Sequence, residues 1–305
     1  MQRDLKKKRA FIAGVGDDQG FGFAIAKALY EEGADVYLGV WTPIYKIFMN
    51  SWNAGKFDQA RTCKNGELFS FIKAYPMDAL YDTMETVPQS VRENKRYAHE
   101  NHYAIKELSE EVTRDAGTID ILIHSLANAP EVKKPLLDTS REGYLSALSS
   151  SSYSLISLVQ HFAPKMPKNS AILSLSYIAS KRAIPKYGGG MSSAKAALES
   201  DVRTLAYEIG KKWGQRINCI SAGPLRSRAA KAIGMIDDMI LYARNNAPLE
   251  KDLDAKEVAE AAVFLVSPLS SAITGVTLFV DNGLHAMGIA EDSASLQKTP
   301  SAIGS

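Results

Sequence analysis

The chain has 305 residues, of which 46% are hydrophobic, and its 36 Lys and Arg nearly balance its 34 Asp and Glu, for a net charge of +2. This composition is typical of a globular protein with a substantial core, and it gives no overall field that favours nucleic acid or an anionic membrane. No apolar run approaches the roughly 18 residues that a membrane span needs. Cys63 and Cys219 and the five His show no metal-binding or disulfide spacing, which fits a reducing compartment without a metal site.

Short apolar runs alternate with longer helical segments along the chain. Because this alternation is typical of βαβ units, we expect an α/β fold: a single-domain, Rossmann-type doubly wound parallel sheet over residues 1–290. The expected strands are Ala10–Ala13, Val36–Val40, Ile119–His124, Ala171–Leu175, Arg216–Ile220 and Val276–Val280, with a further strand that ends at Tyr75. The expected helices are Phe23–Glu32, Tyr103–Asp115, Tyr144–Met166, Ser192–Lys212 and Ala255–Val266.

Two regions lack this regular pattern. Residues Thr42–Asn101 are rich in Trp, Pro, Gly and Asn, and we expect loops and short helices attached to the sheet there. Residues 291–305 are polar and small, and they are expected to form a mobile tail.

The first expected strand leads directly into a glycine-rich turn, Gly14–Gly22, and then into an amphipathic helix. Glycines let the backbone approach a pyrophosphate, and the helix N-terminus offers unpaired N–H groups to it. The turn therefore favours dinucleotide binding, although its spacing departs from G-x-G-x-x-G and a purely structural turn is the alternative.

The second strand ends at Trp41, where dinucleotide folds usually place an acidic residue for the ribose. We expect Trp41 either to stack on adenine or to pack in the core as many tryptophans do. A 2′-phosphate normally needs a nearby cation, and the strand end offers Trp41-Thr42-Pro43, with Lys46 the nearest basic residue. The pattern thus favours NADH over NADPH.

The stretch from Ser174 to Lys195 joins a buried strand to a long helix and holds Tyr187 and Lys195 eight residues apart. Ordinary short-chain dehydrogenases place such a Tyr and Lys four apart on one helical face. Here the glycines 188–190 make Tyr187 a poor helical residue, so we place it on the lead-in and Lys195 about one turn into the helix. The alternative is that Tyr177 merely packs beside the sheet and Lys195 is an exposed helix lysine.

The chain resembles the enoyl-acyl-carrier-protein reductases, a divergent branch of the short-chain dehydrogenases, and especially their plant, chlamydial and apicomplexan type. The motifs that carry the resemblance are GVGDDQGFG at Gly14–Gly22, GVWTPIYKIF at Gly39–Phe48, YPMDA at Tyr75–Ala79, HSLANAP at His124–Pro130, SYIASKRAIPKYGGGMSSAKAALESD at Ser176–Asp201 and ISAGPLRSRAAKAIG at Ile220–Gly234. The resemblance implies a homotetramer that uses NADH to reduce the trans-2 double bond of an enoyl thioester on acyl carrier protein, the last reductive step of type II fatty-acid elongation. It would be cytoplasmic in a bacterium, and in the plastid stroma or apicoplast of a eukaryote.

The resemblance also implies roles for individual residues. Tyr187 would hydrogen-bond the thioester carbonyl and stabilise the enolate, Lys195 would hold the nicotinamide ribose, and Tyr177 would assist near the substrate, together with Ala129. The residues implied in cofactor binding are Gly14, Gly20 and Phe21 at the pyrophosphate, Trp41, Asp78 and Ala79 at the adenine, Ser125, Leu126, Ala127 and Asn128 at the inner face, Lys195, and Ala222, Gly223, Pro224, Leu225 and Ser227 over the nicotinamide. Phe21 and Phe23 replace a Tyr and a Trp of this branch, which keeps stacking but removes a phenol.

Residues 226–248 correspond to the substrate-binding flap of the family. The apolar side chains of this flap either contact an acyl chain or close permanently onto the core; they are Ile233, Met235, Ile236, Met239 and Ile240. Its basic residues Arg226, Arg228, Lys231 and Arg244 either meet an acidic carrier protein or are simply solvated, and Asp237 and Asp238 oppose the first possibility.

Two other functions fit part of the pattern. A short-chain dehydrogenase that reduces a carbonyl would share the fold and the Tyr–Lys pair, and a dinucleotide sensor without catalysis would share only the fold. The presence of both Tyr187 and Lys195 speaks against the sensor. His124, at the end of an apolar strand, is expected to be packed rather than ionised.

Overall fold

Seven parallel strands form one sheet in the computed structural model, which describes residues 5–227, 230, 234–294 and 296. The strand order is β3-β2-β1-β4-β5-β6-β7. The strands are β1 Arg9–Ala13, β2 Asp35–Trp41, β3 Lys73–Met77, β4 Ile121–His124, β5 Ala171–Ser176, β6 Arg216–Ala222 and β7 Thr277–Val280. All seven were expected from the sequence, but β3 extends to Met77 rather than ending at Tyr75. The chain order reverses between β1 and β4, and ligands bind such sheets beyond the carboxyl ends of the strands at that point.

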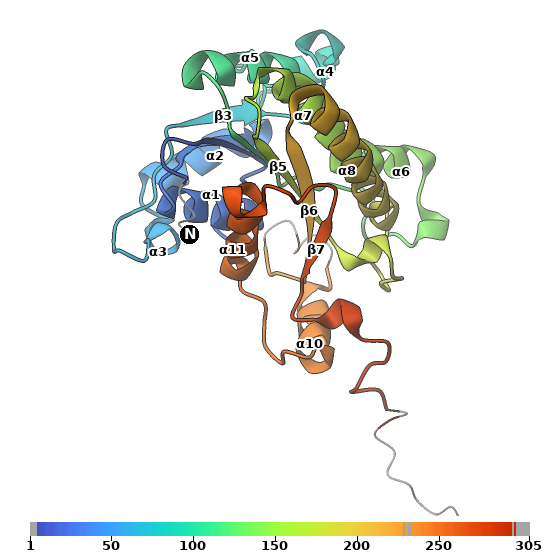
Figure 1. The fold of residues 1–305 in the computed structure, drawn as a ribbon. Helices are drawn as coiled ribbons and strands as arrows, with labels where there is room; N and C mark the ends of the chain where they lie inside the picture. Colours follow the sequence, from blue (N-terminus) through green and yellow to red (C-terminus); the bar gives the residue numbers. More distant parts are fainter. Residues whose placement is uncertain (1–4, 228–229, 231–233, 295, 297–305) are drawn as a thin grey trace, which may run out of the picture.

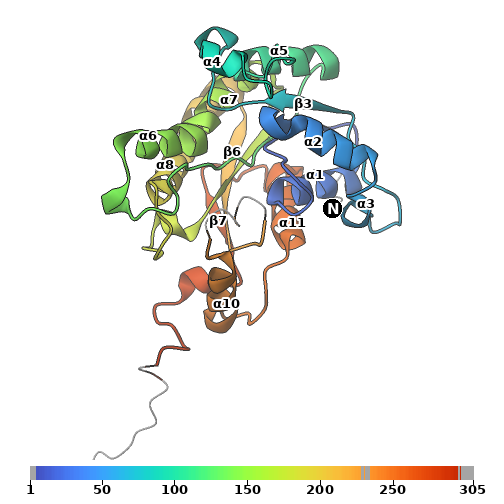
Figure 2. The same cartoon turned by 180° about the vertical axis from the view of Figure 1, so that it is seen from behind.

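Helices cover both faces of the sheet, as the views from the two sides show (Figures 1 and 2). Helices α1 and α11 pack into one apolar core, and α5, α7 and α8 pack into another on the opposite face. The helices are α1 Phe21–Glu31, α2 Thr42–Asn53, α3 Asp58–Arg61, α4 Gln89–Arg92, α5 Ile105–Ala116, α6 Arg141–Leu148, α7 Ser154–Phe162, α8 Met191–Trp213, α10 Ile236–Asn246 and α11 Ala255–Val266. Among the described residues, no helix is both long enough and apolar enough to cross a bilayer.

Two helical regions differ from the expectation. The helix expected over Tyr144–Met166 is divided into α6 and α7 by a π-helical turn, Ser149–Tyr153. Serine hydroxyls bond back to the main chain there, and such bonds compete with the regular helical ladder. In the irregular region, α2 is a full helix of 12 residues, with a proline in its first turn, where proline is tolerated.

Asp292, at the start of the expected tail, contacts α10. The backbone N–H of Asp292 donates to Oδ1 of Asn246 at 3.2 Å. Most of the expected mobile tail lies outside the described residues, so this contact concerns only its beginning.

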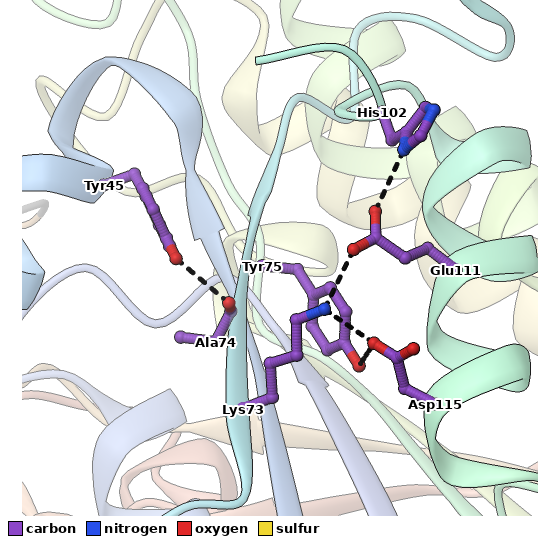
Figure 3. Close-up of polar contacts among 7 residues, drawn as sticks. All are labelled: Tyr45, Lys73, Ala74, Tyr75, His102, Glu111 and Asp115. Carbon is purple, nitrogen blue, oxygen red and sulfur yellow. Dashed lines mark hydrogen bonds and ion pairs between the residues drawn. The ribbon is translucent and has the colours of Figure 1, made fainter. Parts of the chain in front are cut away.

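The edge strand β3 is fastened to α5 by a cluster of charged and phenolic groups (Figure 3). Lys73 Nζ lies 2.9 Å from Glu111 Oε1 and 2.6 Å from Asp115 Oδ2. The buried Tyr75 hydroxyl donates to the same Asp115 oxygen at 2.9 Å, and His102 Nδ1 lies 3.2 Å from Glu111 Oε2. Hydrogen bonding from Lys73 lowers the pKa of Asp115, whereas burial raises that of Tyr75. The cluster fixes the strand whose end carries Asp78.

We expect Asp115→Leu to destabilise the protein more than Asp115→Asn. The leucine leaves the buried Tyr75 hydroxyl without its acceptor, at a cost of about 1–3 kcal/mol, whereas asparagine keeps an acceptor and loses only a half-exposed ion pair worth about 0.5 kcal/mol. Urea unfolding at pH 7 measures both. Because the pKa of Asp115 is depressed in the folded state, the charge contribution is present at pH 7 and is lost as the pH falls through that depressed pKa. Equal midpoints for the two variants at pH 7 would contradict the assignment; Asp138→Asn, at an exposed site, is the control.

Candidate active site

The glycine-rich turn packs directly against the segment that follows β4. Gly14 has φ +102°, and a Cβ at this position would lie 2.2 Å from the carbonyl oxygen of Ser125. A Cβ at Gly22 would lie 3.1 Å from Ser125 Oγ, and the Ser125 N–H donates to Ala13 O at 2.8 Å. Only glycine fits at residue 14, so the turn and the start of the 125–128 segment are held as one unit.

Helix α1 begins at Phe21 immediately after this turn, and its N-cap residue is Gly20. Within the described part of the chain, no side chain caps this end of the helix. The first-turn N–H groups of an uncapped helix and its positive dipole end bind phosphate, so this end fits the pyrophosphate of a dinucleotide.

Trp41, at the end of β2, is 47% exposed, so the expectation of a packed core tryptophan is wrong. Its Nε1 donates to Oδ2 of the buried Asp78 at 3.2 Å. The Tyr97 hydroxyl donates to the same oxygen at 2.5 Å, and burial raises its pKa, so it remains a neutral donor. The structure thus brings together Trp41, Asp78 and the adjoining Ala79, and adds Tyr97, which no sequence motif marked. Nearly half of the Trp41 surface remains exposed and is available to a ligand.

The 125–128 segment is held at its far end by the π-helical turn. The Ser151 hydroxyl accepts from the Asn128 N–H at 2.9 Å and donates to Asn128 O at 2.8 Å. Ser150 Oγ lies 2.7 Å from the same carbonyl. These contacts fix the main chain of Asn128 and leave its side chain exposed.

Tyr177 and Tyr187 lie together although ten residues separate them in sequence. Tyr177 follows β5, and its ring centroid is 5.2 Å from that of Tyr187, with the planes tilted by 59°. Tyr187 precedes α8, as expected from the glycines: Gly189 and Gly190 have φ +61° and +81°. Tyr187 also packs against a small apolar cluster that includes Ala129, which was implied in substrate binding.

Lys195 lies in the second turn of α8 and is only 5% exposed, so the expectation of an exposed helix lysine is wrong. Its Nζ donates to Leu175 O at 2.8 Å, which leaves two N–H groups for a ligand. Burial lowers its pKa to about 8, against the opposing influence of Cys219 and Glu199.

Burial raises the pKa of both site tyrosines, with smaller contributions from Asp281 at Tyr177 and from Tyr177 at Tyr187. Both are therefore phenols at neutral pH, able to donate a hydrogen bond to an oxygen that gains negative charge. Asp281 was missed in the sequence. It follows β7 and is held by the main-chain N–H groups of Gly283 and His285.

His124 is buried and neutral, as expected. Its Nδ1 is 2.8 Å from Ser174 Oγ and its Nε2 is 2.8 Å from Ser154 Oγ, and burial lowers its pKa to about 3. It links β5 to α7. Within residues 5–227 and the described remainder, no group of three or more His, Cys, Asp or Glu is placed to hold a metal ion.

The segment after β6 begins at the carboxyl end of that strand and is bonded to the end of β7. Gly223 N donates to Val280 O at 2.9 Å, with Ala222 and Pro224 buried beside it and with Leu225 and Ser227 half-buried. A cavity of about 570 Å³ opens beside it, lined by Pro224, Leu225, Arg226, Asp237, Ile240, Leu241, Arg244, Asp252 and Leu253.

The two described flap arginines both pair with aspartates. Arg226 lies 2.7 Å from Asp237, and Arg244 makes two contacts with Asp252, at 2.8 and 2.5 Å. Arg228, Lys231 and Ile233 lie outside the described residues. Among the apolar flap residues, Ile236 and Met239 are buried, Met235 is half-buried, and Ile240 lines the cavity.

Comparisons with known proteins agree with this geometry. A family model described as "Enoyl-(Acyl carrier protein) reductase" matches residues 98–285. The chain is 60% identical to enoyl-[acyl-carrier-protein] reductase [NADH] 1, chloroplastic, of Oryza sativa subsp. japonica, over 96% of this chain and 78% of that one. It is 59% identical to the chloroplastic NADH enzyme of Arabidopsis thaliana, over 95% and 74%. The crystal structure of the Plasmodium berghei enoyl-acyl-carrier-protein reductase with triclosan superposes with a TM-score of 0.91 at 48% identity, covering 94% of this chain and all of that one.

We expect Gly14→Ala to weaken NADH binding and to destabilise the fold by about 2–4 kcal/mol, because the new Cβ would overlap Ser125 O as well as strain the backbone. Gly66→Ala is a matched control, since Gly66 also has positive φ, +84°, but nothing lies within 4 Å of its added Cβ. Thermal unfolding and NADH fluorescence titration measure the two effects. A Gly14 variant that matched the Gly66 variant in both would show that the close contact is unimportant.

Proposed function

The chain belongs to the enoyl-acyl-carrier-protein reductase family, and from that premise we propose how its residues perform the reaction. The enzyme uses NADH to reduce the double bond of an enoyl thioester on acyl carrier protein, the last reductive step of fatty-acid elongation. The observation that best supports the residue assignment is the pairing of Tyr177 with Tyr187 near the buried Lys195, at the carboxyl ends of the strands. The carbonyl-reducing dehydrogenase and the non-catalytic sensor are set aside.

The residues at the carboxyl ends of the strands are arranged to bind NADH. The uncapped end of α1 with Gly14, Gly20 and Phe21 suits the pyrophosphate, and the exposed face of Trp41 suits the adenine. Lys195 has two N–H groups left for the nicotinamide ribose. The remaining contacts that we assign are Asp78 and Ala79 beside Trp41, the 125–128 segment, and Ala222 to Leu225 with Ser227. NADH supplies the hydride.

Tyr187 is proposed to donate a hydrogen bond to the thioester carbonyl oxygen. Negative charge develops on this oxygen when hydride reaches the β-carbon, and a donor aimed at it stabilises the transition state. Because burial keeps Tyr187 a phenol, the donor is present throughout the neutral range. Tyr177, whose ring contacts that of Tyr187, supports the same oxygen or the Tyr187 ring, and Ala129 borders the substrate.

We further propose a homotetramer in the plastid stroma. Support for the location is that the rice and Arabidopsis relatives are named chloroplastic. Support for assembly is the family itself, and sedimentation that showed only monomers at micromolar concentration would argue against it. Residues 1–290 are proposed to act as a single domain that carries both the cofactor and the substrate sites.

The flap, residues 226–248, is proposed to close over the acyl chain. The cavity beside it is lined by Ile240 and Leu241 and also by the two Arg–Asp pairs. Closure would exclude water from the developing enolate.

We expect Tyr187→Phe to lower the turnover of crotonyl-CoA by about 10²-fold or more, because it removes only the hydroxyl that stabilises the enolate. NADH oxidation at 340 nm measures it. Tyr207→Phe, at an exposed position of α8, is the matched control and should keep wild-type turnover. Unchanged turnover in Tyr187→Phe would remove this residue from the donor role. Failure of the wild-type enzyme to oxidise NADH with crotonyl-CoA would refute the activity.

Hydrogen exchange tests the flap. We expect fast exchange across Lys231–Ala243 in the free protein and clear protection when cofactor and a substrate mimic are both present. Helix α11, outside the flap, serves as the internal reference. Equal protection of the flap in both states would identify a static helix, in line with the burial of Ile236 and Met239.

A further inference from the structure

Glu199 is a buried carboxylate beside the site that the mechanism above does not use. It lies one turn beyond Lys195 on α8, and it is 3% exposed. Its Oε1 accepts hydrogen bonds from Ser176 Oγ at 2.7 Å and Ser180 Oγ at 2.6 Å. Taking a carboxylate out of water is costly unless hydrogen bonds or a counter-charge compensate it, so this arrangement is a specific one.

The two serine donors bracket Tyr177. Ser176 is the last residue of β5, and Ser180 ends the 3-10 turn Ile178–Ser180. Glu199 therefore holds both ends of the five-residue segment that carries Tyr177. The preceding residue, Leu175, is held through its carbonyl by Lys195. Successive turns of one helix thus fix the two ends of this segment and the residue that precedes it.

Glu199 also faces the charge of Lys195. The other titratable groups that face Lys195 are the Cys219 thiol from β6 and the His124 imidazole from β4, and Lys181 Nζ faces Glu199 with its nitrogen 3.6 Å from Oε2. The pKa of Cys219 is raised to about 12 and that of His124 lowered to about 3, both chiefly by burial, so neither titrates between pH 6 and 9. Burial lowers the pKa of Lys195 to about 8, and the negative charge of Glu199 acts against this decrease.

We propose that Glu199 is a positioning residue of the reaction: its carboxylate fixes the segment that carries Tyr177 and keeps the Lys195 ammonium charged for the cofactor ribose. This inference rests on the proposed function, because it acts through the roles assigned there to Tyr177 and Lys195. It adds the requirement that residue 199 carry a negative charge, which the roles of Tyr177 and Lys195 alone do not demand.

Glu199→Gln separates charge from shape, since the amide oxygen still accepts from both serines. Removal of the negative charge lowers the pKa of Lys195, so the protonated fraction is lost at lower pH. For a decrease of one pKa unit, NADH binds about fivefold more weakly at pH 8 and nearly unchanged at pH 6. The dissociation constant, from NADH fluorescence between pH 6 and 9, and the pH profile of kcat/KM for NADH both measure this shift. Glu208→Gln, the same change at an exposed position of α8, should leave both profiles unchanged.

The double variant Ser176→Ala, Ser180→Ala makes the complementary test. It removes the two anchors of the Tyr177 segment and leaves the ammonium groups of Lys181 and Lys195 as the counter-charges of the Glu199 carboxylate. We expect kcat with crotonyl-CoA to fall by about tenfold while the pH profile of NADH binding stays that of the wild type. This variant also tests the positioning role if Glu199→Gln does not fold.

The outcomes distinguish failure of the Glu199 proposal from failure of the proposed function on which it rests. If Lys195→Ala weakens NADH binding but Glu199→Gln keeps the wild-type affinity and pH profile, the charge role of Glu199 is wrong while the proposed function stands. If the double serine variant keeps wild-type kcat, the positioning role is wrong. If Lys195→Ala itself leaves NADH affinity unchanged, the ribose role fails first and the inference fails with it.

Discussion

The removal of the Lys195 ammonium from water is the constraint around which the site is arranged. A buried cation persists only where nearby dipoles and charges compensate its lost hydration. Here the compensation comes from the Leu175 carbonyl on β5 and the Glu199 carboxylate on α8. The packing of α8 against the end of β5 must therefore be correct before the lysine can be charged. The charge of the Lys195 ammonium therefore depends directly on the correct packing of the fold around it.

The two site tyrosines differ from the arrangement expected for ordinary short-chain dehydrogenases, where a nearby ammonium lowers the phenol pKa. Here burial dominates and raises it, at Tyr177 with the help of Asp281. A phenol that does not ionise is a poor proton source but a persistent hydrogen-bond donor. This agrees with a reaction that needs an oxyanion stabilised rather than a proton transferred to oxygen.

Sequence patterns predicted the sheet and the places of Tyr187 and Lys195 in the fold because these leave local signals. Buried parallel strands are apolar on both faces, and three consecutive glycines exclude Tyr187 from the helix that contains Lys195. Tyr97, Glu199 and Asp281 left no such signal, since the hydrogen-bond partners of Tyr97 and Glu199 lie 19 or more residues away and Asp281 acts through its charge on the distant Tyr177. The serine-rich π-helical turn was read as plain helix because its apolar spacing continues on both sides. The pairing of Arg226 and Arg244 with aspartates likewise depends on how the chain turns after β6.

The π-helical turn between α6 and α7 also changes the rotational phase of the helix. One additional residue in a turn rotates everything after it relative to everything before it, so the two halves of one continuous rod present their apolar stripes in different directions. Ala147 on α6 packs with Met191 and Tyr187 at the site, whereas Leu155 and Leu158 on α7 pack into the core beneath the sheet. A regular helix would align both stripes and serve only one of these clusters. The local irregularity thus lets a single structural element belong to the scaffold at one end and to the substrate side at the other.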